Sequence, residues 1–393
     1  MKSHNQNTRT ICVILTLLAA GPVVQAYPPD PNNAALLYYQ AFISLPKDQD
    51  QVQDLVEGLP DGADPNDQIR EYLKLCQPAI RLAVAASEVP ACDWGLRYSQ
   101  GYQMSLTHLS QMRALARLMK GEVAVLVADG QYRQALERCL TLRQMGQHIS
   151  DQNIISFLVG VAINALAEKA IQNTLSAMPP DIQTLVWLKG ELAASPARRV
   201  EIKNGLKTEE EVILTKLTTD RGHLLEAVTG STGAVPSELV EHLKNADEAF
   251  FEGSRRYFKA HMDAVVAVLN SPVPYLQRHD QLEQLDKRPG SDSKQNLHAV
   301  LTASLMPSVA KLLTLDTRAR SNDNLLKAAI EIYLVKARTG SIPDQLPPGM
   351  PKDPFNGQDF KYEKTPEGFT LTRWTDDPAK DKNFQRTFKV KVR

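Results

Sequence analysis

The sequence has little of what would indicate a metalloprotein, a nucleic-acid-binding protein or a disulfide-rich scaffold. Four cysteines occur among 393 residues, and 45 lysines and arginines are balanced by 45 aspartates and glutamates. This balance gives no electrostatic reason to expect nucleic acid or an anionic membrane surface as a partner. The hydrophobic share of 43% is ordinary for a soluble globular protein.

Metal-binding and cofactor-binding motifs are also missing from the sequence. No histidine has the spacing to a second histidine, a cysteine or a carboxylate that metal sites use, such as His-Glu-x-x-His. The scattered histidines are His108, His148, His223, His242, His261, His279 and His298. We therefore predict no cofactor, and we interpret these histidines as surface or hydrogen-bonded core residues.

A strongly apolar run at the very start of the chain has the features of an export signal. Lys2 and Arg9 precede the apolar residues 11–20, Gly21-Pro22 breaks the helix, and Val24-Gln25-Ala26 provides a cleavage site. The apolar core is about half the ~20 residues that a spanning helix needs. We predict a signal peptide at residues 1–26, a mature chain from Tyr27, and a periplasmic, envelope-associated or extracellular location without a membrane span. An uncleaved N-terminal anchor is the alternative.

Three cysteines remain after cleavage: Cys76, Cys92 and Cys139. In an oxidising compartment we expect one disulfide and one free thiol. A Cys76–Cys92 bond closes a short loop and would contribute about 3 kcal/mol by the chain-entropy model. Cys139 lies on the apolar face of a predicted helix, although a Cys92–Cys139 pair stays open.

The pattern from residue 32 to about 315 is helical almost throughout. Asn32 or Asn33 caps a first helix, a second begins at Asp64-Pro65, and two more flank the turn Asp129-Gly130. A helix over 154–167 is apolar on all sides and should form the buried centre. The polar, glycine- and proline-containing stretch 287–294 predicts a loop.

After Gly340 the sequence changes from a helical pattern to an alternation of apolar and polar residues. Turn signals at 353–357 and 366–368 flank predicted strands over 358–363 and 369–374, and a third strand is predicted within 384–392. The predicted fold class is mainly α, with stacked αα-hairpins and a small C-terminal antiparallel β-sheet. The predicted parts are the signal peptide 1–26, a helical domain 27–315 and a C-terminal helix-plus-sheet module 316–393.

The segment Asp129-Gly130-Gln131-Tyr132-Arg133-Gln134-Ala135-Leu136 resembles the glycine–aromatic–alanine–leucine signature of tetratricopeptide repeats over one repeat. This resemblance implies a helical hairpin of the kind that holds peptides. Residues 91–175 more broadly resemble uncharacterised secreted helical proteins of planctomycete-type bacteria, which implies a fold and no activity.

The C-terminal end resembles the C-terminal half of type II secretion pseudopilins. Helix 325–336, the proline-rich stretch 343–351 and the turn Lys352-Asp353-Pro354-Phe355 precede the small sheet, as they do in that family. The pilin-type N-terminus is absent, so the resemblance implies a packing module and no polymerisation. Some pseudopilins bind calcium in the loop that here holds Asp376, Asp377 and Asp381, and a solvated loop is the alternative.

One candidate catalytic pattern is present twice. Ser308 and Lys311 have the Ser-x-x-Lys spacing of penicillin-recognising enzymes, as do Ser291 and Lys294. So short a pattern arises by chance, no Ser-Asp-Asn follows, and Arg338-Thr339-Gly340 is only a loose match to Lys-Thr-Gly. We therefore predict a non-enzymatic interaction or scaffold protein that binds a protein, peptide or glycan. The alternative is an envelope serine hydrolase with Ser308 as nucleophile and Lys311 as base.

Overall fold

The computed structural model describes residues 30–46, 50–150, 153–194, 202–219, 245–375 and 384–390, with the single residues 224 and 241. Residues 33–393 form one structural unit. The predicted signal peptide, 1–26, and the calcium candidates Asp376, Asp377 and Asp381 lie outside the described residues. The mainly helical fold class with a small C-terminal antiparallel sheet is confirmed.

Short helices form the N-terminal part of the unit. They are α2 (Ala34–Ile43), α3 (Asp50–Glu57), α4 (Asp67–Leu75) and α5 (Gln77–Glu88). The side chains of Asn33 and Asn66 accept hydrogen bonds from the first turns of α2 and α4, which is why these helices begin there. The helix expected from Asp64 onward is in fact two helices, which meet at Cys76.

A helical hairpin and a long central helix follow a 3-10 turn, η1 (Tyr98–Gln103). The hairpin consists of α6 (Thr107–Ala128) and α7 (Tyr132–Ser150), with Gly130 at φ +74° in the turn between them. Then α8 (Ile154–Ala177) begins at its cap Asn153 and runs for 24 residues. It extends ten residues beyond the expected end at 167, because Glu168 is buried and paired within the fold.

The second half of the unit is also helical. Its helices are α9 (Ile182–Ala194), α10 (Ile202–Thr219), α13 (Glu248–Asn270), α14 (Tyr275–Asp292), α15 (Ala299–Leu305) and α16 (Val309–Thr339). The loop expected at 287–294 is wrong: α14 continues to Asp292 with Pro289 in its last turn. The expected border at 315/316 falls inside α16, which ends at Thr339 and is followed by the cap residue Gly340 in the left-handed conformation.

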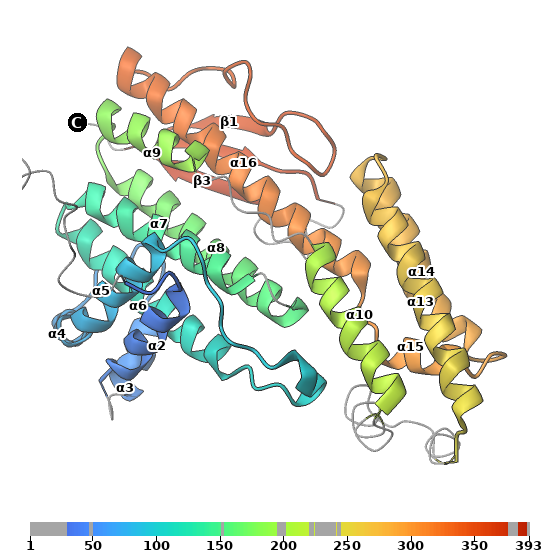
Figure 1. The fold of residues 1–393 in the computed structure, drawn as a ribbon. Coiled ribbons are helices and arrows are strands. Elements are labelled where there is room, and N and C mark those ends of the chain that lie inside the picture. The colour runs from blue at the N-terminus through green and yellow to red at the C-terminus, as the bar shows by residue number, and fades with distance from the viewer. Residues whose placement is uncertain are drawn as a thin grey trace, which may run out of the picture. The chain divides into compact units, whose positions relative to one another are not determined.

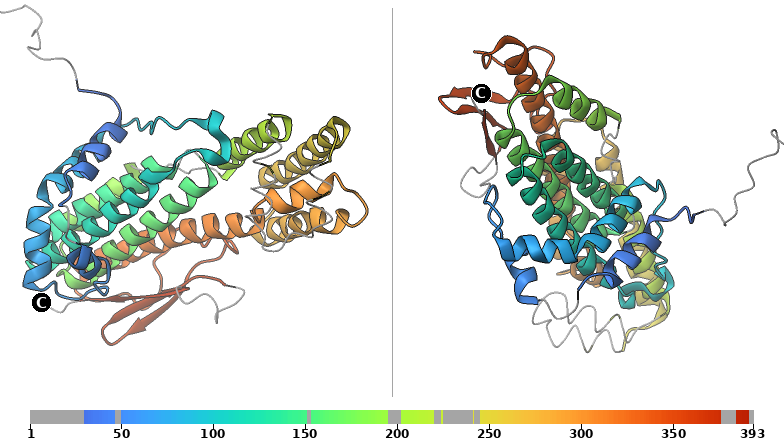
Figure 2. Two further views of the ribbon diagram at one scale, coloured as in Figure 1. Left: turned by 90° about the horizontal axis from the view of Figure 1, so that it is seen from below. Right: turned by 90° about the vertical axis from the view of Figure 1, so that its left-hand side faces the viewer.

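The C-terminal sheet has the order β1 (Lys361–Thr365), β2 (Gly368–Thr372), β3 (Gln385–Lys389), and both pairs are antiparallel. Phe369 of β2 lies opposite Phe388 of β3, and both side chains are fully buried. Both rings contact Tyr333 of α16. The apolar residues that alternate with polar ones along the strands therefore form the buried face of the sheet. Figures 1 and 2 show the sheet lying along α16.

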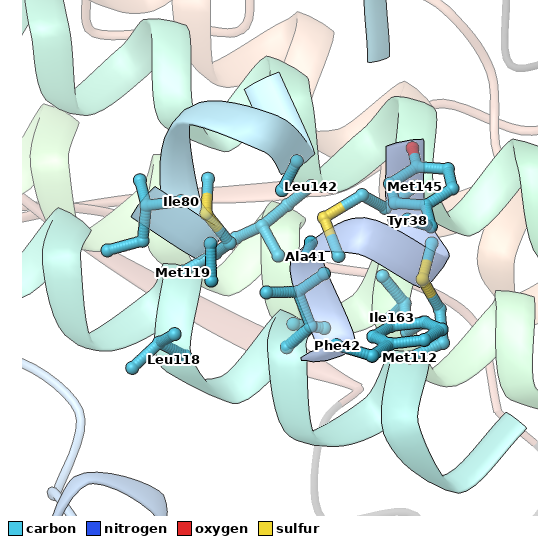
Figure 3. Packing of buried hydrophobic residues seen from close by; sticks show 14 of the residues in the cluster. Tyr38, Ala41, Phe42, Ile80, Met112, Leu118, Met119, Leu142, Met145 and Ile163 are labelled. Carbon is cyan, nitrogen blue, oxygen red and sulfur yellow. The ribbon is translucent and has the colours of Figure 1, made fainter. Parts of the chain in front are cut away.

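Three hydrophobic clusters make up the core of the described part of the chain, and α8 contributes to each of them. Ile163 packs with α2 and α5–α7, Phe157 packs with α10 and α13–α16, and Leu175 packs with α9, the end of α16 and the sheet. Figure 3 shows the first cluster, in which Met112, Met145 and Ile163 surround Tyr38. The expectation of a buried central helix is therefore confirmed for α8.

Among the residues that the structure describes, two segments are long and apolar enough to cross a bilayer, by length and composition only. They are α8 and the stretch Ala299–Thr339. The most apolar 18 residues are 56% buried within the fold in α8 and 44% buried in Ala299–Thr339. The core role of α8 accounts for its apolar composition without a membrane.

Candidate functional site

A cavity of about 300 Å³ lies between α6, α8, the first residue of α7 and the loop from α3 to α4. Its size is at the lower end of the range for small-ligand sites. Two helix faces form most of its wall. The residues of α6 are Lys120, Val123, Ala124, Val127 and Ala128, and those of α8 are Ala170, Asn173, Thr174 and Ala177.

The spacing along both helices explains how the cavity arises. On α8 the lining residues follow an i, i+3, i+4, i+7 pattern, and on α6 an i, i+3, i+4, i+7, i+8 pattern, so each set shares one face. Each face carries two alanines, Ala124 and Ala128 on α6 and Ala170 and Ala177 on α8, whose methyl groups are too short to fill the space between the helices. The space between these two helix faces therefore stays open, whereas larger side chains would fill it.

A few polar groups lie around the cavity. Lys120 forms an ion pair with Asp61 of the α3–α4 loop, with 2.7 Å between Nζ and Oδ1. Arg70 pairs with Asp129 of the α6–α7 turn at 2.7 Å and with Asp64 of the loop at 3.4 Å. These pairs hold the loop against the hairpin. Asn173 and the half-buried Tyr132 add an amide and a phenol to the wall.

The sequence predicted part of this site only. Tyr132 was identified as a member of a helix stripe and of the tetratricopeptide-like segment. The alanines of α6 and α8 were missed because the cavity combines three separate segments. The available signal was the recurrence of alanine at helical spacing on two helices.

A cluster of buried charges lies on the opposite face of α8. Glu168 is 3% exposed, and its Oε2 lies 3.2 Å from Nη2 of Arg386 in β3. Arg143 of α7 pairs with Asp323 of α16 at 3.0 Å, and Lys327 contacts the second oxygen of Asp323 at 2.8 Å. Burial raises the pKa of Glu168 to about 7, although Arg386 and Arg143 oppose this shift.

The predicted catalytic pair is placed at a helix cap. Ser308 is the N-cap of α16, and its Oγ accepts a hydrogen bond from the backbone N–H of Lys311 at 3.3 Å. The same hydroxyl donates to Oδ2 of Asp286 at 2.7 Å, and Asp286 also accepts from the backbone N–H groups of Val309 and Ala310. Lys311 itself is an exposed residue. The Ser-x-x-Lys spacing therefore coincides with N-capping here.

The cysteines differ from the expectation. In the structure Cys76, Cys92 and Cys139 all carry thiols, and the predicted Cys76–Cys92 disulfide is not formed. Cys76 is buried where α4 meets α5, and Cys92 follows the far end of α5, where the adjacent Ala91 carbonyl accepts from the N–H of Ala34. Burial raises the pKa of Cys76 to about 11, which keeps this thiol protonated. Cys139 is fully buried, as its helix stripe predicted.

Within the described part of the chain, no group of three or more histidine, cysteine, aspartate or glutamate side chains is placed to hold a metal ion. Comparisons of the chain with protein-family models, with curated proteins and with solved structures find no match.

Proposed function

We propose that this protein is an exported, non-enzymatic binding protein of the cell envelope or extracellular space. The observation that carries this proposal is the apolar cavity between α6 and α8. The N-terminal apolar segment and its cleavage motif support export. The tetratricopeptide-like segment supports peptide or protein binding, because its Tyr132 is part of the cavity wall.

The occupant we propose is an apolar side chain of a peptide or protein partner. A cavity of about 300 Å³ with an alanine-rich wall suits one large apolar side chain. The Asn173 amide can donate and accept hydrogen bonds, and the Tyr132 hydroxyl can do the same, so both suit the backbone amides on either side of such a side chain. A glycan would find fewer hydrogen-bonding groups here, because alanine and valine supply six of the nine lining residues on the two helix faces.

The proposal is tested with N-acetyl-phenylalanine amide as a mimic of one apolar peptide residue. Millimolar probe should raise the melting temperature of the wild-type protein, because a ligand that binds only the folded state stabilises it. Ala170→Leu places a larger side chain in the cavity and should abolish the increase. Ala165→Leu, on an exposed position of the same helix, should retain it.

The matched polar probe N-acetyl-asparagine amide should leave the melting temperature unchanged. If Ala170→Leu does not fold, Ala124→Leu blocks the cavity from α6 and serves the same purpose. An equal increase in the blocked and the control variants, or none in the wild type, would contradict the proposal.

A further inference from the structure

A second hollow lies on α6, about three helical turns before the cavity between α6 and α8. Its volume is about 400 Å³, and we call it the arginine hollow. One lining residue belongs to the end of α3 and the others to α6: Glu57, Ser110, Gln111, Arg113, Ala114 and Arg117. All of them except Ala114 are polar or charged, so this wall suits a different kind of group from the apolar cavity.

The charges that line the arginine hollow do not cancel. Arg117 forms an ion pair with Glu57, the only acid in the lining among the described residues. Arg113 is exposed, and its guanidinium forms no ion pair or hydrogen bond within the part of the chain that the structure describes. A guanidinium can donate two parallel hydrogen bonds to one carboxylate. The hollow therefore leaves one positive charge available for an anionic group.

The arginine hollow and the cavity lie along the same face of α6. Their lining residues follow one another at steps of three or four positions, which keeps them on one side of a helix. The series is Ser110, Arg113, Arg117, Lys120, Ala124 and Val127. The end of α3 contacts α6 where the two sites adjoin, because Glu57 pairs with Arg117 and the Leu59 carbonyl accepts from Lys120 at 3.5 Å. A ligand that follows this face past the α3 contact therefore reaches both sites.

The separation of the two sites sets the length of such a ligand. Arg113 and Arg117 each stand ten positions before a valine of the cavity wall, Val123 and Val127 respectively. Ten positions of an α-helix correspond to ~15 Å along its axis. An extended peptide advances ~3.3 Å per residue, so about four or five residues cover this distance.

We propose that the peptide partner carries an acidic side chain four or five residues from its apolar one. The apolar side chain fills the cavity, and the carboxylate pairs with Arg113 in the arginine hollow. This inference rests on the proposed function, because it takes the cavity as the site of the apolar side chain. A carboxylate fits better than a phosphate group, because its single negative charge matches the single unpaired guanidinium, whereas phosphate carries nearly two charges.

The test uses peptides in which four serines separate a phenylalanine from a glutamate, made in both chain directions. The matched control has glutamine in place of the glutamate. Alanine-methyl NMR titration of the ¹³C-labelled full mature chain gives both dissociation constants at low ionic strength. In one chain direction the glutamate peptide should bind about three- to fivefold more tightly, the upper range for a solvent-exposed ion pair. High salt should remove this gain.

Two variants locate the carboxylate. Arg113→Gln, at an exposed position, should make the glutamate and glutamine peptides bind equally. Arg338→Gln removes an exposed arginine at the end of α16 and should retain the difference. A peptide with the glutamate directly beside the phenylalanine should show no gain over its glutamine control, because the carboxylate then cannot reach the arginine hollow.

The outcomes separate this inference from the proposed function. If the glutamate and glutamine peptides bind the wild type equally in both directions, the acidic partner is wrong and the apolar cavity site stands. If neither peptide binds, the cavity proposal fails and this inference fails with it. A gain that survives Arg113→Gln, or an equal gain with the adjacent glutamate, would show attraction outside the arginine hollow and would overturn the inference as well.

Discussion

Asp286 shows how one side chain can satisfy the start of a long helix from a neighbouring element. Its carboxylate accepts from the N–H groups of Val309 and Ala310 and from the hydroxyl of Ser308. A carboxylate at this position also interacts favourably with the helix dipole. Ser308 therefore has two structural hydrogen bonds, and both its oxygen and its proton are engaged.

Replacement of Ser308 tests this structural role directly. Ser308→Ala should lower the free energy of unfolding by about 1 kcal/mol, the usual cost of a lost cap. Ser291→Ala removes the serine of the other Ser-x-x-Lys match at an exposed position of α14, and should change stability by less than about 0.5 kcal/mol. Urea denaturation measures both variants.

A fluorophosphonate probe separates the cap from the alternative of a serine hydrolase. We expect no covalent labelling of the folded wild-type protein. Labelling that disappears in Ser308→Ala would instead assign Ser308 as a nucleophile.

Single residues also explain where sequence reasoning stopped short. Glu168 indicates a helix end when it is considered alone, because a charged residue closes the apolar run 154–167. The charge is compensated by Arg386, 218 positions away, and no local pattern reveals that pairing. The cap at Asn33 was predictable, because it depends only on neighbouring backbone groups.

At the scale of elements, α7 and α8 pack closely together because Gly160 of α8 has no side chain. A Cβ at Gly160 would lie 2.6 Å from the carbonyl oxygen of Gly146 and 1.8 Å from Oγ of Ser150. The serine side chain can rotate away, whereas the carbonyl belongs to the backbone of α7. Gly160 is therefore required by the packing of these two helices.

Gly160→Ala should destabilise the protein by about 1–3 kcal/mol, the range for overpacking in a core. Gly190 of α9 is the matched control, because a Cβ there has no atom within 4 Å. Gly190→Ala should stabilise by about 0.5–1 kcal/mol, since alanine loses less backbone entropy in a helix. Equal unfolding free energies for the two variants in urea would contradict the close approach.

Element type was predictable from the sequence to different degrees along the chain. The alternation of Phe369 and Leu371 with polar residues predicted β2, and the same strand has these side chains buried. Pro289 and Gly290 suggested a loop, but α14 tolerates both in its final turn, where Ser293 donates to the Pro289 carbonyl. Local composition could not predict this, because the helix is held by its packing on α13 and α16.

At the scale of the whole molecule, α8 links the parts of the described fold. It lines the cavity on one face, carries Glu168 on the other, and contributes side chains to each core cluster. The cavity-lining residues of α8 lie beyond the helix end expected at 167, and they became recognisable as a partner of the α6 face only in three dimensions.

Export is the other property of the whole chain that the proposal requires. Expression of the full-length chain in a bacterium with a general secretory pathway should give a mature N-terminus at Tyr27. Intact-mass measurement of the soluble exported fraction checks this position. A chain that retains Met1 and sediments with the membranes would favour the uncleaved anchor.

Alanine-methyl NMR of the ¹³C-labelled protein tests the binding site most directly, because five alanines line the cavity. They are Ala63, Ala124, Ala128, Ala170 and Ala177. Titration with N-acetyl-phenylalanine amide should shift the methyl signals of these residues and leave those of Ala35 and Ala83, buried in α2 and α5, unchanged. Shifts confined to alanines outside the cavity, or no shifts at all, would contradict the assignment of this cavity as the ligand site.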